Sequence, residues 1–188
     1  MIRLIITTMM LVLTGSQLVS AAELEEVLSE IANKQVRLSA FTEIRTAYFL
    51  ERPVISKGTL EFKLPGTMIK RITEPESIEQ HIEGDVLTIR QDGEIRHEIS
   101  LSQNLEISAG INAIRWILSG NISALNQNFA IKFDSDNGDW RIKLLPKDTR
   151  VSIEIESLLI LGNNARISLI NIEQTNGDSI KTILYEQR

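Results

Sequence analysis

The stretch Ser56-Lys-Gly-Thr-Leu-Glu-Phe-Lys-Leu-Pro-Gly-Thr-Met-Ile-Lys-Arg-Ile-Thr-Glu-Pro75 contains two strands joined by a turn. Leu60, Phe62 and Leu64 occupy every second position, which is the period of a strand with one apolar face. Pro65-Gly66 ends this strand, because Pro lacks a ladder donor and Gly permits unusual dihedral angles. The second strand has one face made of Met68, Lys70 and Ile72, and Pro75 stops it.

Further strands are predicted before and after the two in this stretch. The full set is 41–50, 55–64, 68–73, 77–83, 86–91, 94–101, 129–133, 140–145, 151–161, 165–173 and 179–185. Gly84-Asp85 and Asp92-Gly93 are two-residue links with hairpin chemistry, and Asp136-Asn137-Gly138-Asp139 between two later strands is a further hairpin signal. Parallel strands need long crossovers, so links this short predict antiparallel neighbours.

Helices are predicted at Glu23–Leu38, within Asn104–Ser119 and at Ile122–Asn128. The first has an apolar stripe of Leu24, Val27, Leu28, Ile31 and Ala32. Lys34 and Arg37 are expected near its C-terminal end, where cations are favourable. The predicted fold class is α+β and mostly β: one strongly curved antiparallel sheet of about eleven strands, an unclosed half-barrel covered by helices.

The N-terminus resembles a secretory signal peptide over Met1–Ala21, and residues 22–188 are expected to form the single mature domain. Arg3 supplies a positive charge, and the apolar run Leu4–Leu13 is shorter than a membrane span. Val19-Ser20-Ala21 is a small-residue cleavage pattern, with a site one residue later as the alternative. An uncleaved anchor helix is the other interpretation.

Composition excludes several function classes. The formal net charge is -5 and the basic residues form no stripe, so nucleic-acid binding is not expected. The chain has no Cys, which excludes disulfides, thiolate metal sites and a Cys nucleophile. Aromatic residues are few and aliphatic residues are many, which suits packing or lipid chains.

The order of features in the opening stretch resembles the outer-membrane lipoprotein carrier (LolA) family. That family has Gly, an aromatic-rich strand, Lys-Arg-Pro, a second aromatic-rich strand and Thr-x-Pro. The residues that match in step are Gly58, Leu60, Lys63, Pro65, Thr73 and Pro75. Leu64 departs by replacing the Arg that the carriers use in cargo handling and release, and Lys70 replaces an aromatic residue. The chain is therefore similar to the divergent LolA-like proteins, whose cargo is often not lipoprotein.

This resemblance implies a periplasmic carrier in a Gram-negative cell envelope. It would bind the acyl chains of a lipid or lipoprotein in an apolar half-barrel cavity and shuttle the cargo between membranes. The partners implied are that cargo, an inner-membrane transporter and an outer-membrane acceptor, with the carrier acting as a monomer and needing no cofactor. The alternative is a non-enzymatic periplasmic scaffold or adaptor for a membrane transporter.

Two sets of residues are candidates for the binding site, although sequence alone does not separate cavity lining from packed core. The candidate cavity residues are Phe41, Leu60, Phe62, Leu64, Met68, Ile72, Trp140 and Ile142. The candidate lid is the mid-chain helix, with Ile111, Ile114, Trp116 and Leu118. Gly110 and Gly120 are expected to flank this lid as flexible points.

Catalytic and metal-binding patterns find little support. No nucleophile elbow, P-loop or dinucleotide fingerprint occurs, so no enzyme activity is expected. Asp134, Asp136 and Asp139 lack the spacing of a calcium loop and predict a polar hairpin. His81 and His97 could face each other across strands, but without an acidic partner they predict no metal site.

Overall fold

The computed structural model describes residues 15–33 and 36–186, and within them one open sheet carries all the strands. The helices are α1 (Gly15–Ala32), η1 (Leu101–Gln103), α2 (Leu105–Leu118), α3 (Ile122–Asn128) and α4 (Thr149–Ser152). The strands are β1 (Val36–Thr46), β2 (Val54–Lys63), β3 (Thr67–Glu74), β4 (Ile78–Glu83), β5 (Val86–Gln91), β6 (Glu94–Ser100), β7 (Phe129–Asp136), β8 (Asp139–Pro146), β9 (Ile155–Asn163), β10 (Arg166–Gln174) and β11 (Ser179–Glu186).

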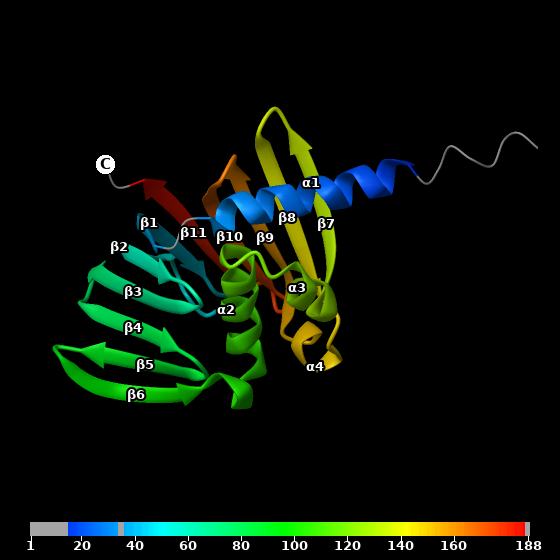
Figure 1. Cartoon of the computed structure of the whole chain (residues 1–188). Helices are drawn as coiled ribbons and strands as arrows, with labels where there is room; N and C mark the ends of the chain where they lie inside the picture. The colour runs from blue at the N-terminus through cyan, green and yellow to red at the C-terminus, as the bar shows by residue number, and fades with distance from the viewer. Residues whose placement is uncertain (1–14, 34–35, 187–188) are drawn as a thin grey trace, which may run out of the picture.

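The strand order explains why helices cover one face of this sheet. The order is β6-β5-β4-β3-β2-β1-β11-β10-β9-β8-β7, and every neighbouring pair is antiparallel. The chain builds outward from β1 to the edge strand β6, crosses to the opposite edge strand β7, and returns to pair β11 with β1. The crossing segment contains α2 and α3, so both helices must pass over the sheet (Figure 1). The predicted unclosed antiparallel half-barrel is confirmed.

Turn chemistry sets the strand register as the sequence predicted. Asn137 and Gly138 have φ values of 50° and 87°, and Asp92 and Gly93 have 54° and 82°. Two successive residues with positive φ are typical of the two-residue hairpin turn that matches the twist of the strands.

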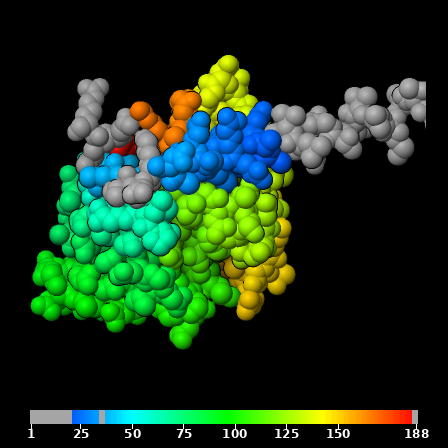
Figure 2. All heavy atoms as spheres, in the orientation of Figure 1, coloured from blue at the N-terminus to red at the C-terminus, as the bar shows by residue number. Residues whose placement is uncertain are grey.

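The core lies between the concave face of the sheet and the helices. Leu24, Leu28 and Ile31 of α1 are buried, as the predicted apolar stripe requires. The atoms of α1, blue in Figure 2, lie directly against the yellow-green atoms of the mid-chain helices. The sheet supplies Phe62, Met68, Ile82, Leu87, Ile142, Leu144, Leu158 and Ile160 to the same cluster. No helix in the described part of the chain combines the length and apolar character of a membrane span.

The predicted helix Glu23–Leu38 is wrong at its C-terminal end. The helix ends at Ala32, and Arg37 and Leu38 belong to β1. Arg37 therefore does not lie at a helix terminus, and Lys34 is outside the described residues, as are Arg3 and Leu4–Leu13 of the predicted signal. The stripe of apolar residues stops at Ala32, and the alternation of β1 extends back to Val36, where pairing with Lys63 overrides helical propensity.

The predicted strand Val151–Leu161 is wrong at its start. Residues 149–152 form the short helix α4, and β9 begins at Ile155. Asp148 caps α4 by accepting a hydrogen bond from the backbone N–H of Arg150 at 2.9 Å.

The prediction that Gly110 flanks the mid-chain helix is also wrong, because Gly110 lies inside α2. Gly120, with φ of 68°, does follow the end of α2.

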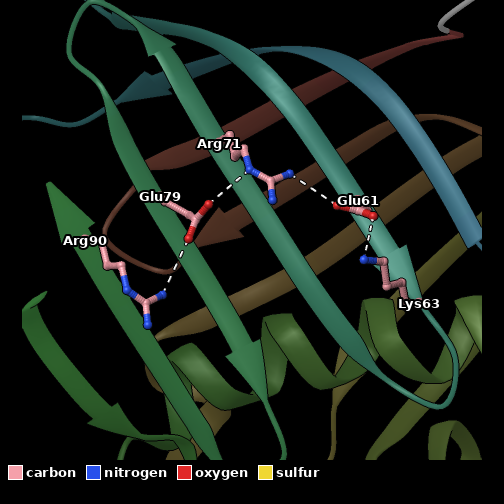
Figure 3. Close-up of polar contacts among 5 residues, drawn as sticks. All are labelled: Glu61, Lys63, Arg71, Glu79 and Arg90. Atoms are coloured by element: carbon pink, nitrogen blue, oxygen red, sulfur yellow. Dashed lines mark hydrogen bonds and ion pairs between the residues drawn. The ribbon is translucent and has the colours of Figure 1, made fainter. Parts of the chain in front are cut away.

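The convex face of β2–β5 carries a ladder of charges (Figure 3). Glu61 contacts Lys63 at 2.9 Å and Arg71 at 3.2 Å. Arg71 continues to Glu79 at 3.0 Å, and Glu79 to Arg90 at 3.5 Å. Lys63 and Arg71, in that order, hold the pKa of Glu61 below its ordinary value. This face is charged, which leaves the concave face as the place for an apolar ligand.

Candidate binding cavity

A cavity of about 440 Å³ lies between the concave face of the sheet and α2. This volume is within the range of about 300–1,000 Å³ that is usual for ligand pockets. Its apolar lining comes from β2 (Leu60, Phe62), α2 (Ile114, Leu118), β10 (Ile167, Ile170) and β11 (Leu184). Four of these residues, Leu60, Phe62, Ile114 and Leu118, were predicted from sequence.

Strand register explains how residues far apart in the chain meet in this cavity. In β1, Arg37 pairs with Phe62 and Ser39 pairs with Leu60. Directly paired residues of antiparallel strands share a face, so these four side chains are on the concave side. The alternation of β2 thus places Leu60 and Phe62 under α2, whereas Glu61 and Lys63 lie on the convex face.

The helical wall presents two different faces. Ile114 and Leu118 line the cavity, whereas Ala113 and Ile117 are fully buried in the core. Trp116 points elsewhere: its ring lies 6.5 Å from that of Phe129, edge to face, beside a separate recess of about 100 Å³. Ile111, the fourth predicted lid residue, is half-buried and packs against the core. Of the predicted lid residues, Ile114 and Leu118 therefore line the cavity, whereas Ile111 and Trp116 do not.

Arg37 is a cation in the cavity lining. The sequence predicted it near the end of a helix, but it lies in β1. Its Nη1 donates to the carbonyl oxygen of Ala165 at 3.2 Å, across the sheet. Its Nε and Nη2 are buried and have no hydrogen-bond partner among the described residues. Burial lowers the pKa of Arg37, but a guanidinium remains protonated in proteins. The alternation at the start of β1, from Val36, was the signal that could have placed Arg37 on a strand.

An ion pair lies further along the same concave face. Lys70 Nζ and Glu43 Oε2 are 2.6 Å apart, and their side chains are only 19% and 18% exposed. The Thr182 hydroxyl also donates to Glu43 at 2.9 Å. Lys70 Nζ lies 5.0 Å from the ring centroid of Phe41, in a cation–π geometry. The residue that replaces a family aromatic is thus neutralised by Glu43 rather than left as a free charge.

The remaining predicted cavity residues do not line this cavity. Phe41 is buried beneath Lys70, and Met68 and Ile142 are buried in the core. Trp140 is also buried, with Nε1 donating to the carbonyl oxygen of Asn164 at 2.7 Å. Ile72 is half-buried on the concave face, where it pairs with Ile78. Leu64 is 37% exposed at the β2–β3 turn and is likewise outside the lining.

The weaker metal candidates are placed apart. His81 pairs with Ile69 and Thr88, whereas His97 pairs with Ile89, whose other neighbour is Gln80. Consecutive residues of a strand point to opposite faces, so the two His side chains do not face each other. In residues 15–33 and 36–186 no group of three or more His, Cys, Asp or Glu side chains is placed to hold a metal.

The chain is similar in sequence to one protein family and in fold to several solved structures. The family model for outer membrane lipoprotein carrier protein LolA-like sequences matches residues 17–187. A DUF1329 family protein from Desulfovibrio piger superposes with a TM-score of 0.50 at 7% identity, covering 88% of this chain and 90% of that one. A LolA superfamily protein from Nitrosomonas europaea superposes with a TM-score of 0.47 at 15% identity, covering 90% of this chain and 94% of that one. The Mycobacterium tuberculosis lipoprotein LppX superposes with a TM-score of 0.43 at 10% identity, covering 84% of this chain and 92% of that one. No match was found among curated proteins.

Proposed function

The chain belongs to the outer membrane lipoprotein carrier protein LolA-like family, and we propose that it carries a lipid or acylated molecule through the periplasm. The acyl chain would lie in the cavity between α2 and strands β1, β2, β10 and β11. The observation that carries this proposal is the cavity of about 440 Å³ with an aliphatic and aromatic lining on the concave face.

The energetics support a soluble carrier with such a lining. Moving an acyl chain from a membrane into water costs roughly 0.8 kcal/mol per methylene, or about 13 kcal/mol for sixteen carbons. A carrier must replace most of the lost apolar contact, at about 25 cal/mol per Å² of buried area. Apolar lining residues that can supply that contact include Leu60, Phe62, Ile114, Leu118, Ile167, Ile170 and Leu184.

The binding test uses protein purified from cells that express the full-length chain, delipidated and then incubated with a lipid extract. Native mass spectrometry should detect bound acyl species on the wild type. Leu60→Asp should lose most of this binding, because a carboxylate in the apolar lining costs several kcal/mol to desolvate.

The matched control is Ile153→Asp, because Ile153 is 67% exposed and lies outside the cavity lining. It should bind like the wild type, with circular dichroism showing that both variants are folded. Equal binding by the wild type and folded Leu60→Asp would place the lipid elsewhere, and no binding by the wild type would contradict the carrier function.

One observation favours the scaffold or adaptor alternative. Tyr48 and Phe49 are 83% and 64% exposed at the β1–β2 connection, next to the exposed Val54 and Ile55. The loop is held in place because the backbone N–H of Tyr48 donates to the buried Asp178 at 2.9 Å. An ordered apolar surface of this kind is typical of protein contacts. The alternative predicts that delipidated protein binds a membrane transporter and takes up no lipid.

A further inference from the structure

Charge is distributed unevenly around the cavity. The chain has 25 acidic and 20 basic residues, yet the described residues that line the cavity include Arg37 and no Asp or Glu. Elsewhere on the sheet, partly buried cations contact carboxylates, as Lys70 contacts Glu43 and Arg71 contacts Glu61. The cavity of this negatively charged protein therefore has a partly buried cation, Arg37, beside its apolar residues.

Arg37 has hydrogen-bonding capacity that the described protein groups do not use. A guanidinium has five N–H donors, and the structure assigns Arg37 one acceptor, the Ala165 carbonyl oxygen. Nε and Nη2 are buried without an acceptor among the described residues. A buried charged donor without an acceptor is costly, so a ligand that supplies acceptors gains this free energy on binding.

The position of Arg37 relates this donor group to the apolar lining. Arg37 pairs with Phe62 across β1 and β2 and is on the same concave face as Leu60. All three residues line the cavity, with Ser39 and Ser168 as further polar groups in its lining. The arrangement is a guanidinium on one wall of an apolar space, which matches a molecule with an acyl chain and an acidic head.

We propose that Arg37 binds the anionic head group, a carboxylate or a phosphate, of a single-chain amphiphile whose acyl chain lies along Leu60, Phe62 and Ile114. This rests on the proposed carrier function and adds selectivity for acidic over neutral cargo. Arg suits this role because its planar donors can engage two oxygens of a carboxylate or phosphate at once.

The test compares four probes against delipidated full-chain protein below their micelle concentrations: palmitate, lysophosphatidate, the neutral monopalmitoylglycerol, and inorganic phosphate. Wild type should bind at least one acidic amphiphile about ten-fold more tightly than the neutral one, which corresponds to about 1.4 kcal/mol. Arg37→Met should remove this difference and leave affinity for the neutral amphiphile unchanged. Preference for palmitate or for lysophosphatidate would identify the head group, and inorganic phosphate should bind far more weakly than either.

The matched control is Arg45→Met, because Arg45 is exposed at the other end of β1 and outside the cavity lining. It should retain the preference for acidic amphiphiles. Equal wild-type affinity for acidic and neutral amphiphiles would overturn the role of Arg37 while leaving the carrier function intact. An equal loss for all amphiphiles in Arg37→Met would also overturn it, since that indicates altered packing. Failure of every amphiphile to bind wild type would instead reject the carrier function.

Discussion

Two cations on the concave face, Lys70 and Arg37, differ in the partners that neighbouring residues supply. Lys70 is neutralised within the protein, since Glu43 lies 2.6 Å away and Thr182 orients that carboxylate. Arg37 has a backbone carbonyl as its acceptor and two further buried donors without one among the described residues. The first arrangement is typical of structure, and the second leaves capacity for a ligand.

At the same scale, the convex charge ladder should make stability depend on pH through Glu61. The pKa of Glu61 is lowered in the folded protein, so its ionised form favours folding. This contribution is fully present above the unfolded pKa and is lost as pH falls through the lower folded pKa. Glu61→Gln should reduce the free energy of unfolding at neutral pH by up to about 1 kcal/mol, since the pair is partly solvated.

Urea unfolding measured from neutral to acid pH checks this prediction. The difference between wild type and Glu61→Gln should shrink toward zero in acid, while Glu94→Gln, an exposed change at the start of β6, should have little effect throughout. A difference that persists unchanged in acid would show that Glu61 acts through packing rather than charge.

At the scale of elements, α2 is both a core helix and one wall of the cavity. Arg115 ties it to the sheet: Nη1 donates to the carbonyl oxygen of Gly84 at 2.9 Å. The same side chain covers Gly66, where an added Cβ would come within 2.9 Å of Nε. Leu64 lies in the same turn as Gly66, next to this contact with Arg115.

Arg115→Met should therefore loosen α2 without removing its apolar contacts. Loss of one charge-assisted hydrogen bond near the surface is worth about 1 kcal/mol, a factor of roughly five in the population of an opened helix. Hydrogen exchange of the α2 amides and the rate of lipid uptake should both increase by about that factor. The exposed Arg96→Met on β6 should change neither. Unchanged exchange in Arg115→Met would mean that apolar packing alone holds the helix.

Elements with a clear hydrophobic period or a characteristic turn sequence were predictable from the sequence. Element boundaries that depend on long-range strand pairing were not. The Asn137-Gly138 hairpin, α3 and the alternation of β2 are where the sequence placed them. The start of β1 was missed because its pairing with β2 is a long-range contact that outweighs the helical pattern before it. That error concealed Arg37, so the most informative cavity residue could not be predicted as one.

At the scale of the molecule, the path of the chain creates the binding space. The two edges of the open sheet are connected through α2 and α3, which places a helical layer over the concave face. Sequence correctly predicted this architecture but could not rank lining against core. Leu60 and Ile142, for example, have similar apolar character, yet the first lines the cavity and the second is fully buried.

The position of a bound acyl chain tests the proposed carrier function most directly. Methyl NMR of delipidated protein, titrated with a fatty acid that carries a nitroxide at the end of its chain, reports this position by paramagnetic broadening. If the acyl chain lies in the cavity, the methyl signals of Leu60, Ile114 and Ile170 should broaden selectively, and those of Ile55 and Ile153 should be unaffected. Broadening centred on Ile55 beside the exposed Tyr48 and Phe49, with the cavity signals unchanged, would contradict this placement.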